Sequence, residues 1–193
     1  REASVAMRGT IAPELANNRR AWFTDTLDDV NGVSTTIQKM SAALAANGKE
    51  IEVMVSRNEV DVPGIPLKNF SPIGEFELPE YELQKLSFPP LLQIIDHLKS
   101  GSFTEVIIST PGPVGLVALA AARVLGLPTA GIYHTDFPEY VRILTEDGLM
   151  ESLTWNYMHW FYSQLDMIYV NSDHYRQCWI DRGIAPEKLK ILP

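Results

Sequence analysis

The stretch of residues 21–48 constrains the fold of this chain most, because it joins an apolar strand to an amphipathic helix through a glycine turn. Residues 21–23 are the expected strand, and Gly48 ends the helix at a position that favours a left-handed backbone. The helix repeats an apolar residue every three or four positions, at Val33, Ile37, Met40 and Leu44. A strand followed by a helix in this way predicts the first βα unit of an α/β domain.

The turn inside this unit, at Asn31, Gly32 and Val33, is a predicted ligand site. The first backbone N–H groups of a helix have no partner within the helix, and the aligned peptide dipoles favour negative charge there. Gly32 lets a ligand approach the backbone closely, and Ser34 is expected to cap the helix. We therefore expect a ligand with anionic groups to bind at this turn.

Composition and charge exclude several classes of function. The 193 residues suit one ordinary domain or one half of a larger two-domain enzyme. A net charge of -8 with no basic run argues against nucleic acid as a partner and against purely electrostatic docking on anionic lipid. Cys178 is the only cysteine, so an internal disulfide and a cysteine-built metal site are excluded, and a reducing cytoplasm is the expected compartment.

The chain divides into a short tail and one domain. Residues 1–18 carry no strong period, and we expect them to be a tail or linker from upstream sequence, with the domain covering residues 19–193. The longest apolar run, residues 113–133, is interrupted by Arg123 and divided by Gly126 and Pro128. This run therefore predicts a helix and a strand, not a membrane span.

Beyond the first unit, short apolar runs alternate with amphipathic or alanine-rich stretches. The runs predict strands at residues 51–55, 65–70, 75–78, 106–108, 129–133, 167–170 and 188–192. The stretches between them predict helices near residues 88–101, 112–126, 137–144, 151–165 and 172–183. Because the connections are short, this alternation predicts a parallel sheet covered by helices on both faces.

Ligands of such sheets bind beyond the carboxyl ends of the strands. That rule selects four loops, at residues 25–33, 109–113, 134–140 and 171–172. In the second loop Thr110 and Gly112 repeat the pattern of the first turn, since small residues lead into a helix, although a tight connection explains them nearly as well. Asp28 and Asp29 in the first loop are explained at least as well by solvated charge as by function.

The third loop carries the strongest candidate for a catalytic residue. His134 follows an apolar strand directly, so it is expected to point into the cleft, where it would donate to a sugar hydroxyl or move a proton; a histidine satisfied by a backbone carbonyl is the alternative. Thr135 and Asp136 are candidates for binding hydroxyls, and Asp136 would equally well cap the helix at Phe137. A metal site here lacks a third ligand, and no glycine fingerprint for a dinucleotide is present, so no metal or cofactor is expected.

The helix near residues 151–165 is unusual because large aromatic and apolar side chains surround it. They are Trp155, Tyr157, Met158, Trp160, Phe161 and Tyr162. A helix buried between the sheet and its neighbours is the better explanation. A surface at the edge of a membrane is the alternative, because Trp and Tyr favour such interfaces, so peripheral membrane contact stays open.

Four segments together resemble the N-terminal half of family 4 retaining glycosyltransferases, which have the two-domain GT-B fold, over nearly all of residues 20–193. They are F-T-D with V-N-G-V (residues 23–25 and 30–33), S-T-P-G-P-V-G-L (109–116), Y-H-T-D-F-P (133–138) and D-M-I-Y-V-N-S (166–172). The pairing of the second and third segments is most similar to the branch that includes sulfoquinovosyl- and mannosyltransferases. The resemblance implies a Rossmann-like domain.

The resemblance also implies an activity and roles for residues. The family transfers a sugar from a nucleotide diphosphate sugar to a hydroxyl acceptor with anomeric retention and without a metal. Asn31, Gly32 and Val33 would approach the donor, and His134 would contact the donor sugar. The acceptor side would be formed by Thr110, Gly112, Thr135 and Asp136. The leaving phosphate would itself deprotonate the acceptor, so no protein nucleophile is expected.

Two further expectations concern the whole enzyme. The family's nucleotide-binding half, with a basic pair and two glutamates seven residues apart, would follow Pro193, so this chain alone is expected to fold without transferring sugar. Two alternatives remain open. The chain is half of a nucleotide-sugar 2-epimerase, which also uses paired αβ halves, or it is a non-catalytic module that binds sugars or anions.

Overall fold

A computed structural model describes residues 18–192 with the exception of 79–80, 135 and 146. Its main sheet has seven strands in the order β3-β2-β1-β6-β7-β8-β9, and each neighbouring pair is parallel. The strands are β1 (Arg20–Phe23), β2 (Ile51–Val55), β3 (Leu67–Asn69), β6 (Glu105–Ile108), β7 (Thr129–Tyr133), β8 (Met167–Val170) and β9 (Leu189–Ile191). The order reverses beside β1, which creates the crevice where such sheets bind ligands.

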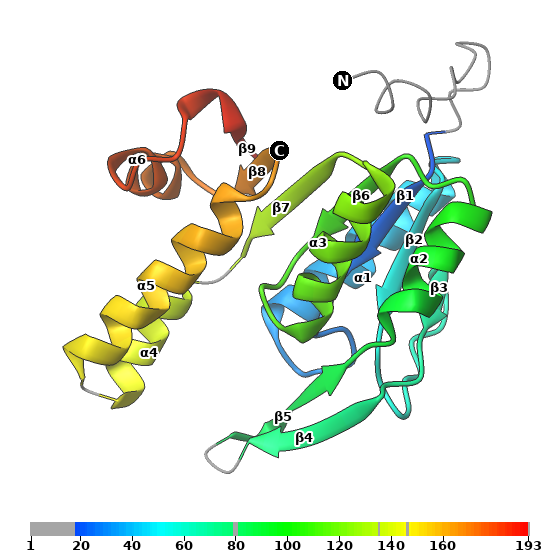
Figure 1. Cartoon of the computed structure of the whole chain (residues 1–193), viewed down its shortest axis with the longest axis horizontal. Helices are drawn as coiled ribbons and strands as arrows, with labels where there is room; N and C mark the ends of the chain where they lie inside the picture. The colour runs from blue at the N-terminus through cyan, green and yellow to red at the C-terminus, as the bar shows by residue number, and fades with distance from the viewer. Residues whose placement is uncertain (1–17, 79–80, 135, 146, 193) are drawn as a thin grey trace, which may run out of the picture.

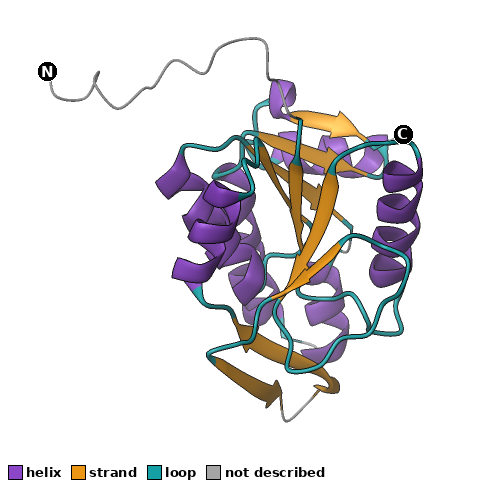
Figure 2. Ribbon diagram, turned by 90° about the vertical axis from the view of Figure 1, so that its right-hand side faces the viewer, coloured by secondary structure: helices purple, strands orange, loops and turns teal. Residues whose placement is uncertain are grey.

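Helices flank this sheet on both sides (Figure 2). They are α1 (Gly32–Ala46), α2 (Leu91–Ser100), α3 (Pro113–Leu125), α4 (Phe137–Thr145), α5 (Gly148–Ser163) and α6 (Asp173–Asp181), with a 3-10 turn at Pro186–Lys188. The predicted fold class, a Rossmann-like parallel sheet with helices on both faces, is confirmed. Residues 1–17 lie outside the described part of the chain, so the tail expected at residues 1–18 and the boundary at residue 19 stay predictions.

Successive strand residues supply two separate cores. In β1, Ala21 and Phe23 pack on the face covered by α2, α3, α5 and α6, whereas Trp22 packs with Ile37 of α1 on the opposite face. All four side chains are buried. Since side chains alternate along a strand, a strand buried on both faces is apolar throughout, which is why β1, β6 and β7 were readable as continuous apolar runs.

A hairpin outside the main sheet was only half predicted. β4 (Gly74–Leu78) pairs antiparallel with β5 (Tyr81–Phe88), and Figure 1 shows the two projecting beyond the carboxyl ends of the strands. The sequence predicted β4 but missed β5. The apolar residues of the β5 sequence change from odd to even positions along the strand, so the two-residue period that marks a strand is broken.

The cap of α1 differs from the prediction. Asn31 is the cap: its side-chain oxygen accepts a hydrogen bond from the Ser34 N–H at 2.8 Å. Ser34 lies inside the helix, where its hydroxyl donates to the Leu27 carbonyl oxygen. The helix begins at Gly32, so Asn31 occupies the position from which a side chain reaches the third helical N–H. The predicted end of the helix is confirmed, since Gly48 has a φ of 69°.

Candidate functional site

A cavity of about 500 Å³ lies at the carboxyl ends of the strands and receives residues from all four predicted loops. Its lining includes five of the predicted site residues, Asn31, Gly32, Val33, Thr110 and His134. The remaining lining residues are Thr26, Thr36, Ser109, Phe137, Tyr162, Asn171 and Leu192. The topology therefore brings together loops that are up to 140 residues apart, between Asn31 and Asn171, as the strand-end rule requires.

The N-terminus of α1 opens onto this cavity. Among the described residues, none accepts a hydrogen bond from the Gly32 or Val33 N–H. A Cβ added at Gly32 would meet nothing within 4 Å, so the backbone is approachable there. Asn31 is fixed on both sides, because its amide nitrogen also donates to the Thr26 hydroxyl at 2.8 Å. The turn is rigid, open and able to donate backbone hydrogen bonds to an anionic group.

His134 lines the same cavity and is partly buried. Its Nε2 lies 3.2 Å from the Ser109 hydroxyl oxygen, which accepts a hydrogen bond from the Trp22 indole N–H at 2.7 Å. Burial lowers the pKa of His134 to about 4, so the ring is neutral at physiological pH. The predicted cleft position of His134 is what the structure shows, and its hydrogen-bond partner is a side chain, not the carbonyl of the alternative.

No charged side chain lines this cavity among the residues that the structure describes. The polar groups are hydroxyls, two amides and the neutral imidazole, while Tyr162 keeps its proton because burial raises the pKa of its phenol above the usual range. Hydroxyls and amides pair with the hydroxyls of a sugar without a large desolvation cost. The cavity therefore combines a neutral polar interior with one helix terminus that favours negative charge.

A second cavity of about 230 Å³ adjoins the first and shares Thr26, Thr110 and Phe137 with it. It is more apolar, and it lies between the β4–β5 hairpin and α5. Its other lining residues are Asp25, Asp29, Arg57, Leu86, Pro111, Gly112, Thr154, Tyr157 and Met158. The predicted site residue Gly112 thus lines this cavity, and Thr110 lies between the two.

Asp25 closes the turn that leads into α3. One carboxylate oxygen accepts from the Thr110 hydroxyl at 2.6 Å, and the other accepts from the Val114 N–H at 2.8 Å. A Cβ added at Gly112 would lie 2.6 Å from this carboxylate. Burial raises the pKa of Asp25 above its usual value, and the hydrogen bonds from Thr110 and Val114 oppose that shift. The N-terminus of α3 is therefore already occupied by a negative group of the chain itself.

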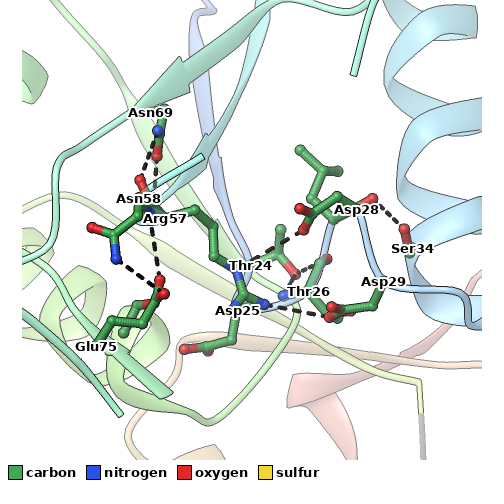
Figure 3. A network of polar contacts seen from close by, with 12 residues as sticks. Thr24, Asp25, Thr26, Asp28, Asp29, Ser34, Arg57, Asn58, Asn69 and Glu75 are labelled. Carbon is green, nitrogen blue, oxygen red and sulfur yellow. Dashed lines mark hydrogen bonds and ion pairs between the residues drawn. The ribbon is translucent and has the colours of Figure 1, made fainter. Parts of the chain in front are cut away.

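Arg57 holds the acidic loop in place (Figure 3). Its guanidinium donates to the Asp25 carbonyl oxygen and lies 3.4 Å from the Asp29 carboxylate and 4.0 Å from that of Asp28. Its backbone N–H and carbonyl bond to the Asn69 side chain at 3.0 and 2.9 Å. Asp29 and the more exposed Asp28 thus lie beside a buried cation, so ion pairing with Arg57 as well as solvation accounts for their charge.

Asp25 and Arg57 line the smaller cavity but were not predicted as site residues from the sequence. One signal was available for Arg57, because it follows strand β2 by two residues and so lies at the carboxyl edge of the sheet. Asp136 lines neither cavity; it accepts hydrogen bonds from the Tyr133 hydroxyl at 3.2 Å and the Glu139 N–H at 3.3 Å, which is the capping arrangement. Thr135 lies outside the described residues.

The helix α5 is not buried all round. Met158, Phe161 and Tyr162 are buried, whereas Trp160 is 49% exposed and Leu153 is 53% exposed. Within the described part of the chain, no helix is long and apolar enough to cross a membrane. The described residues also hold no group of three or more His, Cys, Asp or Glu side chains placed to bind a metal ion.

Comparisons with known proteins place these features in a family. The family model described as Glycosyltransferase Family 4 matches residues 30–193. No curated protein matches the chain by sequence.

Solved structures share the fold at low sequence identity. HepE of Anabaena, solved in complex with UDP-glucose, is 12% identical with a TM-score of 0.56, over 90% of this chain and 43% of that one. Sucrose-phosphate synthase of Thermosynechococcus elongatus is 12% identical with a TM-score of 0.58, over 91% and 48%. UDP-GlcNAc 2-epimerase of Methanocaldococcus jannaschii is 13% identical with a TM-score of 0.54, over 90% and 45%. The chain thus spans less than half the length of these proteins.

Proposed function

The chain belongs to glycosyltransferase family 4, and on that premise we propose that it is the acceptor-side half of a retaining GT-B glycosyltransferase. The reaction would move a sugar from a nucleotide diphosphate sugar to a hydroxyl of a lipid or sugar acceptor. The finer assignment to the sulfoquinovosyl- and mannosyltransferase branch is part of this proposal.

One observation carries the proposal: the larger cavity is lined by hydroxyls, amides and a neutral imidazole, and the open N-terminus of α1 adjoins it. A nucleotide diphosphate sugar has the matching polarity, since its sugar is neutral and its diphosphate is anionic. The Gly32 and Val33 N–H groups would donate to phosphate oxygens, with Asn31 holding the turn. His134 would donate to a hydroxyl of the transferred sugar.

The acceptor would enter through the smaller cavity, which Thr110 and Gly112 line where it meets the larger one. Thr135 and Asp136 were predicted on the same side, but the contacts of Asp136 favour a capping role for it. The apolar lining from Leu86, Tyr157 and Met158 suits an acceptor with an apolar portion. In this proposal the leaving phosphate takes the proton of the acceptor hydroxyl, so no protein nucleophile, metal or cofactor takes part.

The proposal includes a second half of the enzyme that supplies most contacts to the nucleotide. The solved structures with this fold are more than twice as long as the matched region. We expect this chain alone to fold but to transfer no sugar, and turnover by the isolated chain would contradict that expectation. The proposed location is the cytoplasm, with peripheral membrane contact as the open alternative.

The test is a product analysis with the full-length protein. It would be incubated with UDP-, GDP- and ADP-linked sugars and a panel of sugar and lipid acceptors, with EDTA present in a parallel series. We expect a new glycoside with the anomeric configuration of the donor, formed equally with EDTA. An epimerase, the candidate favoured by the likeness to UDP-GlcNAc 2-epimerase, would instead change the donor sugar when no acceptor is present.

A further inference from the structure

Three side chains from three strands form a hydrogen-bonded chain that ends at the cavity. The Trp22 indole nitrogen lies 2.7 Å from the Ser109 hydroxyl oxygen, and that oxygen lies 3.2 Å from His134 Nε2. Trp22 is 1% exposed and Ser109 is 3% exposed, so both partners of the first contact are buried. Trp22 belongs to β1, while Ser109 and His134 directly follow β6 and β7, so the sheet itself fixes their spacing.

Two placements of the protons fit these contacts, and burial decides between them. An indole nitrogen can only donate, so Ser109 must accept the hydrogen bond from Trp22. The Ser109 hydroxyl then has its own proton to place, and among the described residues its one remaining partner is His134 Nε2. If Nε2 carried the proton, the unpaired donor would be the hydroxyl of Ser109, which is 3% exposed; if the hydroxyl donates to Nε2, the unpaired donor is an N–H of the partly exposed His134, which costs less. A neutral imidazole that accepts at Nε2 carries its proton on Nδ1.

We propose that Trp22 and Ser109 are positioning residues that hold His134 as the neutral tautomer with its proton on Nδ1. His134 then acts on a ligand as a hydrogen-bond donor through Nδ1 and not as a proton acceptor. Nδ1 makes no hydrogen bond with any residue that the structure describes, while the ring lines the larger cavity. The role toward a ligand rests on the proposed function, whereas the tautomer is a property of the protein without ligand.

This tautomer determines which chemical groups of a ligand can form a hydrogen bond with His134. A group that faces His134 needs a lone pair, as a sugar hydroxyl oxygen or a phosphate oxygen has, and an ammonium group would be rejected. His134 is also unsuited to deprotonating an acceptor hydroxyl, because Nδ1 is already protonated and Nε2 is engaged by Ser109. The arrangement thus selects an oxygen of the donor as the partner and leaves removal of the acceptor proton to another group.

The surroundings of His134 keep the ring neutral. No described charged side chain lines its cavity, and Tyr162 of α5, the ionisable group that faces the same space, keeps its proton. Asp136, two residues further along, accepts from the Tyr133 hydroxyl and the Glu139 N–H. Desolvation lowers the pKa of His134 to about 4, which agrees with a ring that stays neutral through the physiological range.

Nitrogen-15 NMR of the histidine side chains tests the tautomer directly in the ligand-free chain. Spectra of the labelled protein would be recorded between pH 5.5 and 8, and the His134 signals would be assigned by their loss in His134→Gln. We expect Nδ1 to give the signal of a protonated nitrogen and Nε2 that of an unprotonated one throughout this range. A His134 with its proton on Nε2, or one that titrates near pH 6.5, would overturn the proposal.

Two variants test whether Ser109 and Trp22 determine the tautomer of His134. Ser109→Ala removes the donor to Nε2, so the Nε2–H tautomer should become populated, while burial should keep the pKa of His134 below its ordinary value. Trp22→Phe removes the donor that orients the Ser109 hydroxyl, so the hydroxyl can rotate and accept from a protonated Nε2, and we expect the same change to a smaller extent. Unchanged His134 signals in a folded Ser109→Ala variant would exclude a positioning role.

A matched control separates this effect from loss of packing. Trp179→Phe also shortens a fully buried indole, but Trp179 packs in the core on the opposite face of the sheet from Trp22. We expect its His134 signals to match those of the wild type. If Trp22→Phe does not fold, Ser109→Ala and the wild-type tautomer still decide the question. Because every spectrum is recorded without ligand, the outcome is independent of whether the protein transfers a sugar.

Discussion

Two turns at the carboxyl edge of the sheet, before α1 and before α3, each place a glycine at the start of a helix. In the structure the helix terminus is open at the first turn and occupied at the second. Gly32 precedes α1 with open space where a side chain would lie, and its helix terminus faces a cavity. Gly112 precedes α3 with the Asp25 carboxylate 2.6 Å from the same position, and that carboxylate accepts the Val114 N–H. One helix terminus is available to a ligand, and the other is filled by the chain.

The difference shows that a glycine turn before a helix does not by itself define an anion site. What decides is whether a neighbouring loop supplies its own negative group. Asp25 comes from the loop after β1 and is 89 residues from Val114 in sequence. It also ties that loop to the turn before α3. The first turn thus leaves its helix terminus open to the larger cavity, and the second sets the position of Thr110 between the two cavities.

The largest expected effect is at the filled turn. Gly112→Ala places a methyl group against the buried Asp25 carboxylate, which must move and lose hydrogen bonds from Thr110 and Val114. We expect the free energy of unfolding to fall by about 2–3 kcal/mol, measured by urea denaturation. Gly32→Ala is the control, with a change within about 0.5 kcal/mol. Equal losses in the two variants would mean that the turns do not differ in this way.

A double-mutant cycle tests whether Asp25 is the cause. Asp25→Ala alone should lower the free energy of unfolding by about 2 kcal/mol, because the Val114 N–H and the Thr110 hydroxyl lose their acceptor. In that background Gly112→Ala should cost at least about 1 kcal/mol less than in the wild type, since the methyl group then meets open space. Additive losses would show that the constraint on Gly112 lies elsewhere.

The sequence predicted the sheet and the edge where the site lies, because both follow from local patterns. Apolar runs gave the strands, and the strand-end rule selected the loops that supply Asn31, Thr110 and His134. The contacts between side chains of different loops could not be predicted in the same way. The pairing of Asp25 with Thr110 joins residues 85 apart, and no local period reports such a contact.

The cap of α1 shows a different limit. Both Asn31 and Ser34 are residue types that cap helices, and the choice between them depends on where the helix begins. Helix boundaries shift by a residue or two when a preceding glycine accepts the helical conformation, as Gly32 does here. The type of each element was therefore predictable from sequence, whereas the group that satisfies each terminus depended on the exact start of the helix at α1 and on a contact 89 residues away at α3.

A smaller effect is expected at the cap of the open turn. Asn31→Ala removes the acceptor for the Ser34 N–H and the donor to Thr26, so we expect a loss of about 1 kcal/mol in the free energy of unfolding. Asn31→Asp keeps the acceptor and should recover part of this loss. Urea denaturation of the two variants measures both values. A loss of unfolding free energy as large as that of Gly112→Ala would mean that the open turn contributes as much to stability as the filled turn does.

Substitution of Gly32 by valine is expected to change stability least. The same substitution is expected to weaken the binding of nucleotide sugars most. Gly32 lines the larger cavity and a Cβ added there meets nothing within 4 Å, so Gly32→Val should change the free energy of unfolding by less than about 0.5 kcal/mol. Gly148→Val is the matched control, because Gly148 also begins a helix directly after a capping residue, here Asp147, has open space around its added Cβ, and lines neither cavity. Titration calorimetry of the full-length protein with nucleotide sugars should show at least a tenfold rise in Kd for Gly32→Val alone. If Gly32→Val binds nucleotide sugars as tightly as the wild type does, the ligand lies away from the N-terminus of α1. The proposal that the open turn binds the donor would then be wrong.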